Sequence, residues 1–139
     1  MSDFKRTDGV IGSQAFDANS STQLHTLGRE ACGEDFATTD YGEGIFVYVK
    51  GVASTVVGSV VTISEDDWST ALATANGVGR TAFAMSACVA GEFGWYQICG
   101  KAVAKSKAAN ADNAAQYLTS TAGSLDDAVV AGDRVHRGI

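Results

Sequence analysis

The stretch Ile45-Phe-Val-Tyr-Val-Lys50 consists almost entirely of β-branched and aromatic residues. Such residues suit the half-buried surface of a pleated strand. Gly42 and Gly44 precede the stretch and Gly51 ends it, and glycines at such positions interrupt regular structure. The sequence therefore predicts a β-strand over residues 45–50, and the rest of the fold can be worked out from this strand.

Further strand signals follow on the C-terminal side. Residues 55–63 predict two strands, or one kinked strand with its bend at Gly58. Residues 80–90 read as a half-buried strand, and the turn-like Gly91-Glu-Phe-Gly94 leads from them into a second run over residues 95–104, so the two runs predict a long β-hairpin. Strand signals recur at roughly 8 to 15 residues, which predicts an all-β, mainly antiparallel domain. A sandwich, a jelly-roll-like fold and a barrel all stay open.

One short segment is ambiguous between helix and strand. Ser64-Glu-Asp-Asp-Trp68 resembles a helix start, since Ser64 is followed three residues later by Asp67. The residues that follow it do not develop an apolar stripe with helical spacing. We therefore expect a strand after Trp68 rather than a helix.

The first 44 residues differ in character from the rest. Gly, Ser, Thr, Asn and Asp occur at frequent intervals there, without a sustained period of 2 or 3.6. The sequence predicts an extended N-terminal arm over residues 1–44 and a β-rich core domain over residues 45–139. The arm is either disordered when free or ordered by lying across a neighbouring subunit.

Composition narrows the class of partner. Apolar residues make up 45% of the chain and charged residues 19%, below the roughly 25% of ordinary globular proteins. A surface with few charges can be covered by a protein partner at little desolvation cost. The net charge of −6 argues against direct binding of nucleic acid, which requires clustered Lys and Arg. The chain also shows no export signal and no run of 18 apolar residues, so we expect cytoplasmic synthesis and no membrane contact.

Catalytic and cofactor signatures are missing from the sequence. The two histidines, His25 and His136, lie outside any nucleophile motif. Cys32, Cys88 and Cys99 form no CxxC pair and no zinc spacing, so we interpret them as free thiols, with Cys88 and Cys99 buried in apolar strands. A disulfide between Cys88 and Cys99 stays open as the alternative. We expect no enzymatic activity, no cofactor and no metal.

Trp95 and Tyr96 are the most conspicuous aromatic pair. Adjacent strand residues point to opposite faces of a sheet. We therefore expect at least one of the two in the core. Either both pack there, or the other contacts a partner or stacks on a sugar ring.

Three segments resemble small structural proteins of tailed-phage virions. They are Phe46-Val-Tyr-Val-Lys-Gly-Val-Ala53, Gly91-Glu-Phe-Gly-Trp-Tyr-Gln-Ile-Cys-Gly-Lys-Ala102 and Thr119-Ser-Thr-Ala-Gly-Ser-Leu-Asp-Asp127, and the G-W-x-Q-I-x-G pattern in the second is the most telling. The resemblance covers residues 45–139. It implies a head decoration, or cement, protein that forms a dimer or trimer, binds the outer surface of the assembled capsid and clamps neighbouring major capsid protein subunits.

The expected contact residues come from both parts of the chain. We expect Phe4, Lys5, Arg6 and Phe16 of the arm to contact the capsid, together with Trp95 and Tyr96. The alternative interpretation is a glycan- or receptor-binding β-module displayed on the virion.

Overall fold

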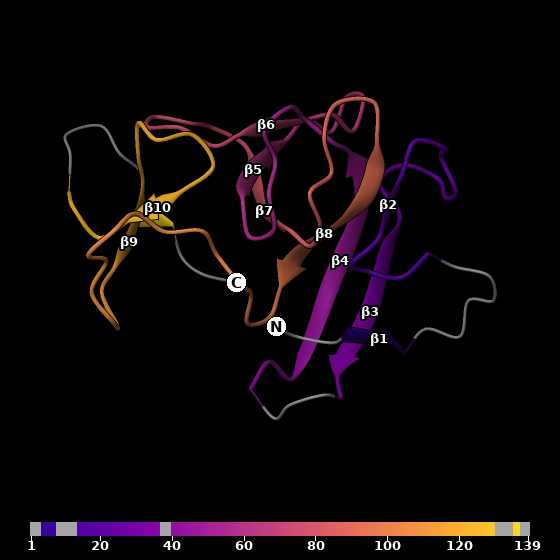
Figure 1. Ribbon diagram of the computed structural model, residues 1–139, viewed down its shortest axis with the longest axis horizontal. Helices are drawn as coiled ribbons and strands as arrows, with labels where there is room; N and C mark the ends of the chain where they lie inside the picture. The colour runs from indigo at the N-terminus through magenta and orange to yellow at the C-terminus, as the bar shows by residue number, and fades with distance from the viewer. Residues whose placement is uncertain (1–3, 8–13, 37–39, 130–134, 137–139) are drawn as a thin grey trace.

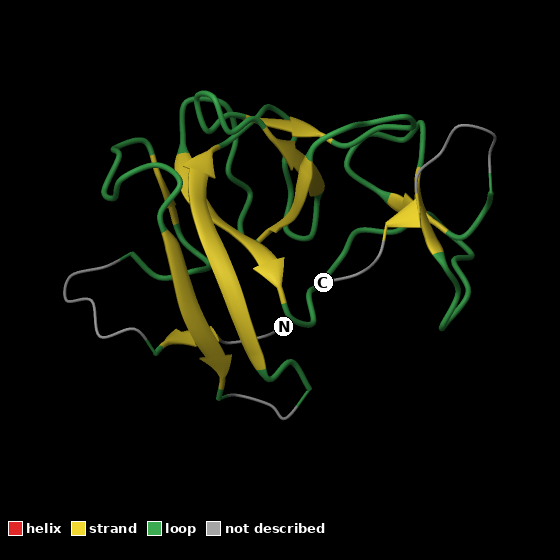
Figure 2. Ribbon diagram, turned by 180° about the vertical axis from the view of Figure 1, so that it is seen from behind, coloured by secondary structure: helices red, strands yellow, loops and turns green. Residues whose placement is uncertain are grey.

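A computed structural model describes residues 4–7, 14–36, 40–129 and 135–136 (Figure 1). Every regular element in these residues is a β-strand, and none is a helix (Figure 2). All named strand pairs are antiparallel. The predicted all-β, antiparallel fold is confirmed, and its layering is sandwich-like.

The described strands form a large sheet and a small one. The large sheet has the order β1-β3-β4-β8-β7-β5-β6, with β2 paired to β8, and the small sheet has the order β10-β9-β11. In Figure 1, β9 and β10 lie at the opposite end of the molecule from β1 and β3. The bounds are β1 Phe4–Arg6, β2 Asn19–Ser20, β3 Glu30–Asp35, β4 Glu43–Lys50, β5 Val60–Ile63, β6 Thr70–Leu72, β7 Arg80–Ala84, β8 Phe93–Cys99, β9 Gln116–Leu118, β10 Leu125–Asp126 and β11 Val135–His136.

Strand β4 confirms the strand predicted at residues 45–50 and lies inside the large sheet. It pairs with β3 on one side and with β8 on the other, so that Val47 lies opposite both Glu30 and Tyr96. Residues 46–49 are all fully buried. Because successive side chains of a strand alternate between faces, this burial means that both faces of the sheet are covered at β4.

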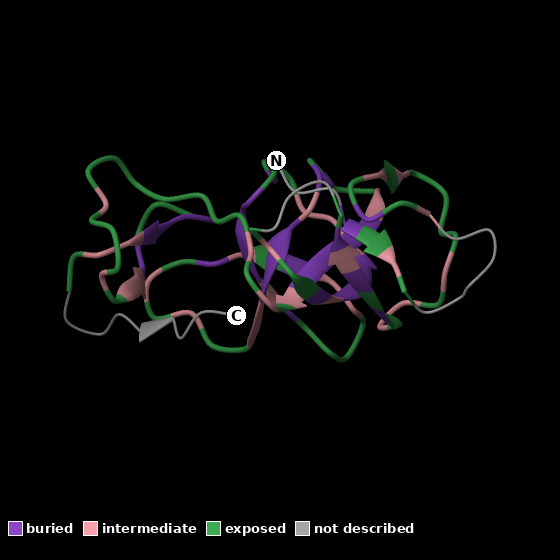
Figure 3. Cartoon of the chain, turned by 90° about the horizontal axis from the view of Figure 1, so that it is seen from below, coloured by how far each residue is buried: buried purple, intermediate pink, exposed green. Residues whose placement is uncertain are grey.

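Two apolar clusters cover these faces, and Figure 3 shows the buried residues concentrated along the large sheet. The aromatic cluster consists of Phe4, Phe16, Ala31, Phe46, Tyr48 and Trp95. The aliphatic cluster consists of Val47, Val49, Val61, Ile63, Ala82, Ala84, Cys88 and Tyr96. A third cluster, Val60, Ala73, Phe83, Leu118 and Leu125, joins the large sheet to the small one.

The large sheet bends around the aliphatic cluster. The amide of Lys50, at the end of β4, donates to the carbonyl of Trp68 over 3.0 Å. The hydroxyl of Thr70 donates to the carbonyl of Lys50 over 2.8 Å. These bonds bring the β6 end of the sheet against β4, so the sheet encloses the cluster from two sides.

The ambiguous segments resolve in favour of strands, with shorter bounds than expected. Gly58 lies in a turn with φ of +85°, and the strand begins only at Val60. Strand β6 confirms the expectation of a strand after Trp68. Strands β7 and β8 pair antiparallel as predicted, but the long hairpin with a tight turn at residues 91–94 was wrong. The register holds two pairs, Phe83 with Gln97 and Ala84 with Tyr96, and residues 85–92 connect the strands.

The segment 1–44 differs from the expected arm in its described residues. It contributes β1 and β3 to the same sheet as β4, and β2 to the side of β8. Phe4 and Phe16 are 8% and 2% exposed and belong to the aromatic cluster. The physical reason is that the apolar side chains of this polar segment are few but cover one face of β4, so no boundary separates it from the core at residue 44.

Candidate partner-binding site

Four expected contact residues meet beside the edge strand β1. Phe4, Lys5, Arg6 and Phe16 line a hollow of about 390 Å³, called here the β1 hollow. The hollow is also lined by three residues that the sequence did not single out, namely Gln14, Ala15 and Asp17. The site thus joins β1 to the turn that carries Phe16.

Strand pairing orients the side chains of β1. Phe4 lies opposite Asp35, and Arg6 lies opposite Gly33. Phe4 and Arg6 therefore share the face that carries the aromatic cluster, while the side chain of Lys5 projects from the other face. A Cβ at Gly33 would come within 2.6 Å of the Phe16 ring, so the glycine lets this ring lie against the sheet.

The floor of the β1 hollow is a packed aromatic stack. The Phe16 ring stacks on Phe46 at a centroid distance of 4.1 Å and meets Trp95 edge-on at 5.3 Å. The guanidinium carbon of Arg6 lies 5.0 Å from the centroid of Trp95 and 5.2 Å from that of Phe16. Both distances suit cation–π attraction, which holds the Arg6 side chain on the stack.

Burial divides the residues around the hollow into floor and rim. Phe4 and Phe16 belong to the floor, because almost none of their surface reaches solvent, so they support the hollow from the core and do not offer the exposed contact surface that was expected. Ala15 and Asp17 are exposed and form the rim, whereas Lys5 is exposed on the other face of β1. The rim residues Ala15 and Asp17 carried no sequence signal, since a small residue and a lone carboxylate in a polar segment are common on any surface.

Trp95 and Tyr96 differ from the expectation that one of them contacts a partner. Both are 0% exposed. They do point to opposite faces, Trp95 into the aromatic cluster and Tyr96 into the aliphatic cluster, but both faces are covered. Burial raises the pKa of the Tyr96 phenol, whose hydroxyl lies 3.4 Å from the carbonyl of Cys88. Neither ring offers a face for stacking on a sugar.

His25 supports the turn behind the hollow. Its Nε2 accepts a hydrogen bond from the amide of Gln14 over 3.1 Å. Its ring lies edge-on to Tyr48 at 5.0 Å and 5.4 Å from the centroid of Trp95. His25 therefore anchors the segment that carries Phe16. The side chain of His136 lies outside the described residues.

The three cysteines are free thiols, as expected. The expected burial of Cys88 is confirmed, although it lies in the connection between β7 and β8 and not in a strand. The expected burial of Cys99 was wrong, because it lies at the exposed end of β8. In the part of the chain that the structure describes, no three His, Cys, Asp or Glu side chains are grouped to hold a metal ion. The same residues include no helix with the length and hydropathy needed to cross a membrane.

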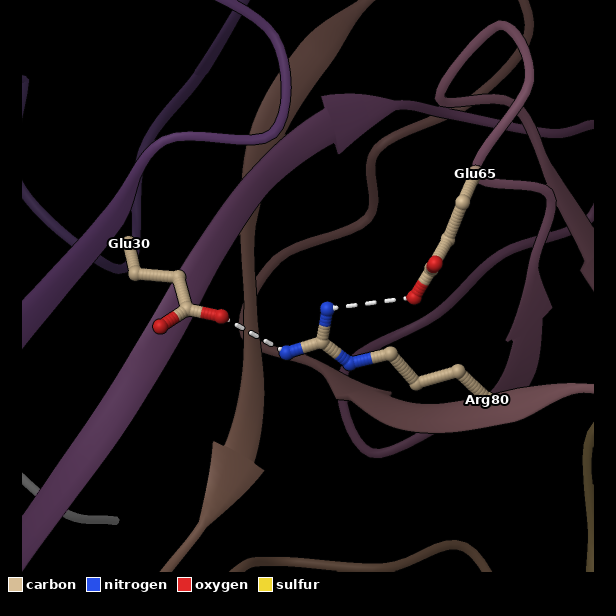
Figure 4. Close-up of polar contacts among 3 residues, drawn as sticks. All are labelled: Glu30, Glu65 and Arg80. Atoms are coloured by element: carbon tan, nitrogen blue, oxygen red, sulfur yellow. Dashed lines mark hydrogen bonds and ion pairs between the residues drawn. The ribbon is translucent and has the colours of Figure 1, made fainter.

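A separate charged group spans the bend of the large sheet (Figure 4). Arg80 of β7 contacts Glu30 of β3 at 2.8 Å and Glu65, after β5, at 3.4 Å. All three side chains are between a third and two-thirds exposed, at 33%, 52% and 61%. Because solvent screens such ion pairs, these contacts across the sheet contribute little to the stability of the fold.

No protein-family model, curated protein or solved structure matches this chain. The resemblance to phage structural proteins therefore stands on the quoted segments alone. Of these, the G-W-x-Q-I-x-G pattern corresponds to β8, where Trp95, Tyr96 and Gln97 are all fully buried.

Proposed function

We propose that this protein is a head decoration protein of a tailed phage. It binds the outside of the assembled capsid and stabilises contacts between major capsid protein subunits. The observation that carries the proposal is the meeting of Phe4, Lys5, Arg6 and Phe16 at one edge of the sheet. Sheet edges and the hollows beside them commonly receive extended segments of partner proteins.

The β1 hollow combines a rigid floor with an exposed rim. The floor is held by the stacked rings of Phe16 and Phe46, so little side-chain freedom is lost there on binding. The rim carries the exposed carboxylate of Asp17, whose negative charge favours a partner segment with a positively charged side chain at that place. The hollow is therefore suited to a specific but modest contact.

Stabilisation of the capsid follows from mass action. A protein that binds the assembled shell and not its separated subunits favours the shell, increasingly so as its free concentration exceeds the dissociation constant. The proposal includes self-association as a dimer or trimer on the outer capsid surface. It includes neither nucleic acid nor membrane as a direct partner.

The experiment is to mix the purified protein with expanded, undecorated capsids. We expect saturable co-sedimentation and a higher melting temperature of the shell. Replacing the exposed Ala15 by Arg fills the β1 hollow without removing a core side chain, and it is expected to weaken binding about tenfold.

Ala108→Arg is the matched control, because Ala108 is also exposed but lies in the loop before β9, outside the hollow. This variant should bind like the unmodified protein. Absence of saturable binding, or an unchanged melting temperature of the shell, would exclude the decoration function. Equal loss of binding in both variants would exclude the β1 hollow as the contact.

A further inference from the structure

Two of the three cysteines line a single hollow on the other side of β1. Cys32 and Cys99 are both exposed, and they line a space of about 470 Å³ with Thr7, Gly33, Glu43, Gly44 and Ile45. This space is called here the thiol hollow. Cys32 lies opposite Ile45 on β3, and Cys99 lies opposite the same Ile45 on β8. The pairing thus brings residues 67 positions apart (99 − 32) into one row.

The two thiols are too far apart to bond to each other. They lie on strands either side of β4, and each step between neighbouring strands is about 4.8 Å, so their Cα atoms are separated by roughly 10 Å. A disulfide needs Cα atoms within about 7 Å. Each thiol can therefore react only with a partner from outside the chain.

The third cysteine, Cys88, serves as an unreactive reference for the two exposed thiols. Cys88 is fully buried in the aliphatic cluster. Burial raises the pKa of its thiol to about 11. At pH 8 it is therefore both inaccessible and almost wholly protonated, and the protonated thiol is not the nucleophile.

Carboxylates give the thiol hollow a negative character. Glu43 lines the hollow, Glu34 lies directly opposite it on β3, and Lys5 of β1 lies opposite Glu34, so these three residues together carry one net negative charge. A hydrogen bond to Glu43, reinforced by repulsion between the two carboxylates, raises the pKa of Glu34. The net charge of the whole chain, −6, has the same sign. A positively charged reagent is thus attracted to this hollow, and a negatively charged one is repelled.

We propose that the thiol hollow is a modification site for small, positively charged disulfides, at which Cys32 and Cys99 each form a mixed disulfide. The thiolate attacks one sulfur of the reagent, a new S–S bond forms, and the reagent's own S–S bond breaks. The other half of the reagent leaves as a thiolate and takes up a proton from water. No net oxidant is needed, because the reagent disulfide is reduced as the cysteine is oxidised.

The test uses cystamine, whose two ends are cationic, and intact-mass spectrometry of the full chain at pH 8. We expect two adducts to form well before a third. Cys32→Ser and Cys99→Ser should each remove one early adduct, whereas Cys88→Ser should retain both. Circular dichroism of the doubly modified protein should match that of the unmodified protein.

The charge preference is tested with dithiodipropionate, an anionic disulfide. Rates are divided by those of the same reagents on the neutral thiol N-acetylcysteinamide. At low ionic strength, cystamine should then be favoured by about threefold or more, and Glu43→Gln should reduce this preference. Asp112→Asn is the control, because it removes the same unit of charge from an exposed loop outside the thiol hollow.

Three results would overturn the proposal. One is modification of Cys32 and Cys99 no faster than that of Cys88, since the thiols would then be reached only by unfolding. Another is an intramolecular disulfide between Cys32 and Cys99. The last is an equal normalised rate for the two disulfides. None of these results bears on capsid binding, which concerns the β1 hollow.

Discussion

The ring of Phe16 stacks on the ring of Phe46 with a centroid distance of 4.1 Å and an angle of 19° between the planes. This contact joins the polar first segment of the chain to the central strand β4. Phe16 also touches Trp95 and carries the Arg6 guanidinium, so it is the centre of the aromatic cluster.

Replacing Phe16 by Ala should therefore destabilise the whole domain. Truncating a buried Phe costs about 3 to 5 kcal/mol, and for a chain of this size that lowers Tm by roughly 10 to 17 °C. Thermal unfolding followed by circular dichroism measures the change. Leu24→Ala, at a side chain that is 53% exposed, should change stability by less than about 0.5 kcal/mol. Equal effects of the two substitutions would contradict the described packing.

Removal of residues 1–40 should prevent folding. The shortened chain loses β1 and β3, the pairing partner of β4, and it also loses Phe4, Phe16 and Ala31 from the aromatic cluster. Trp95 and Tyr48 would then be exposed to water. We expect loss of cooperative thermal unfolding and a red-shifted Trp emission. A truncated protein that unfolds cooperatively with an unchanged Tm would show instead that the first segment is a separable arm.

Replacing Gly28 by Ala should cost more than the same change at Gly91. Both glycines have φ of +83°, so each Ala is disfavoured by about 1 to 2 kcal/mol. At Gly28 the new Cβ would also meet the Trp68 ring, whereas at Gly91 nothing lies within 4 Å. We expect Gly28→Ala to be less stable than Gly91→Ala by about 2 kcal/mol in urea unfolding. Equal midpoints would mean that Trp68 does not pack on Gly28.

The contact between Glu34 and Glu43 predicts that Glu34→Gln increases thermal stability in a pH-dependent way. The pKa of Glu34 is raised from its ordinary value of 4.5, so the folded state holds this proton more tightly than the unfolded chain. The pair therefore lowers stability at pH 7, and this effect disappears as the pH falls through the raised pKa to below 4.5. We expect Glu34→Gln to increase Tm slightly at pH 7 and to leave it unchanged at pH 3.5. Asp112→Asn, which removes the same charge from an exposed loop, should show no such pH dependence.

The positions of the strands could be predicted where the signal is local. The β-branched and aromatic run at residues 45–50 specifies β4, and the Gly-Glu-Phe-Gly segment locates the start of β8 to within two residues, since the strand begins at Phe93. The role of the first segment could not be predicted in this way. Its strands are held by long-range pairing, β3 with β4 and β2 with β8, and by the burial of two phenylalanines, neither of which leaves a periodic pattern in the sequence.

The candidate site, too, could be predicted only in part from the sequence. The sequence singled out Phe4, Lys5, Arg6 and Phe16, and the structure brings these four together in one hollow. The sequence also indicated that Trp95 and Tyr96 point to opposite faces of the sheet, because side chains alternate in any strand. Whether those faces meet water depends on what covers the sheet, and here both are covered.

By itself, the sequence determined the all-β class and the interior strand β4, because residue type and glycine spacing act locally. Only the tertiary structure decided that Phe16 closes the core and that Cys32 and Cys99 share a hollow. The physical reason is that antiparallel pairing sets side chains beside each other by register. Register brings together positions that are far apart in the chain. It depends on which side chains are buried over the whole sheet, and no single segment of the sequence specifies it.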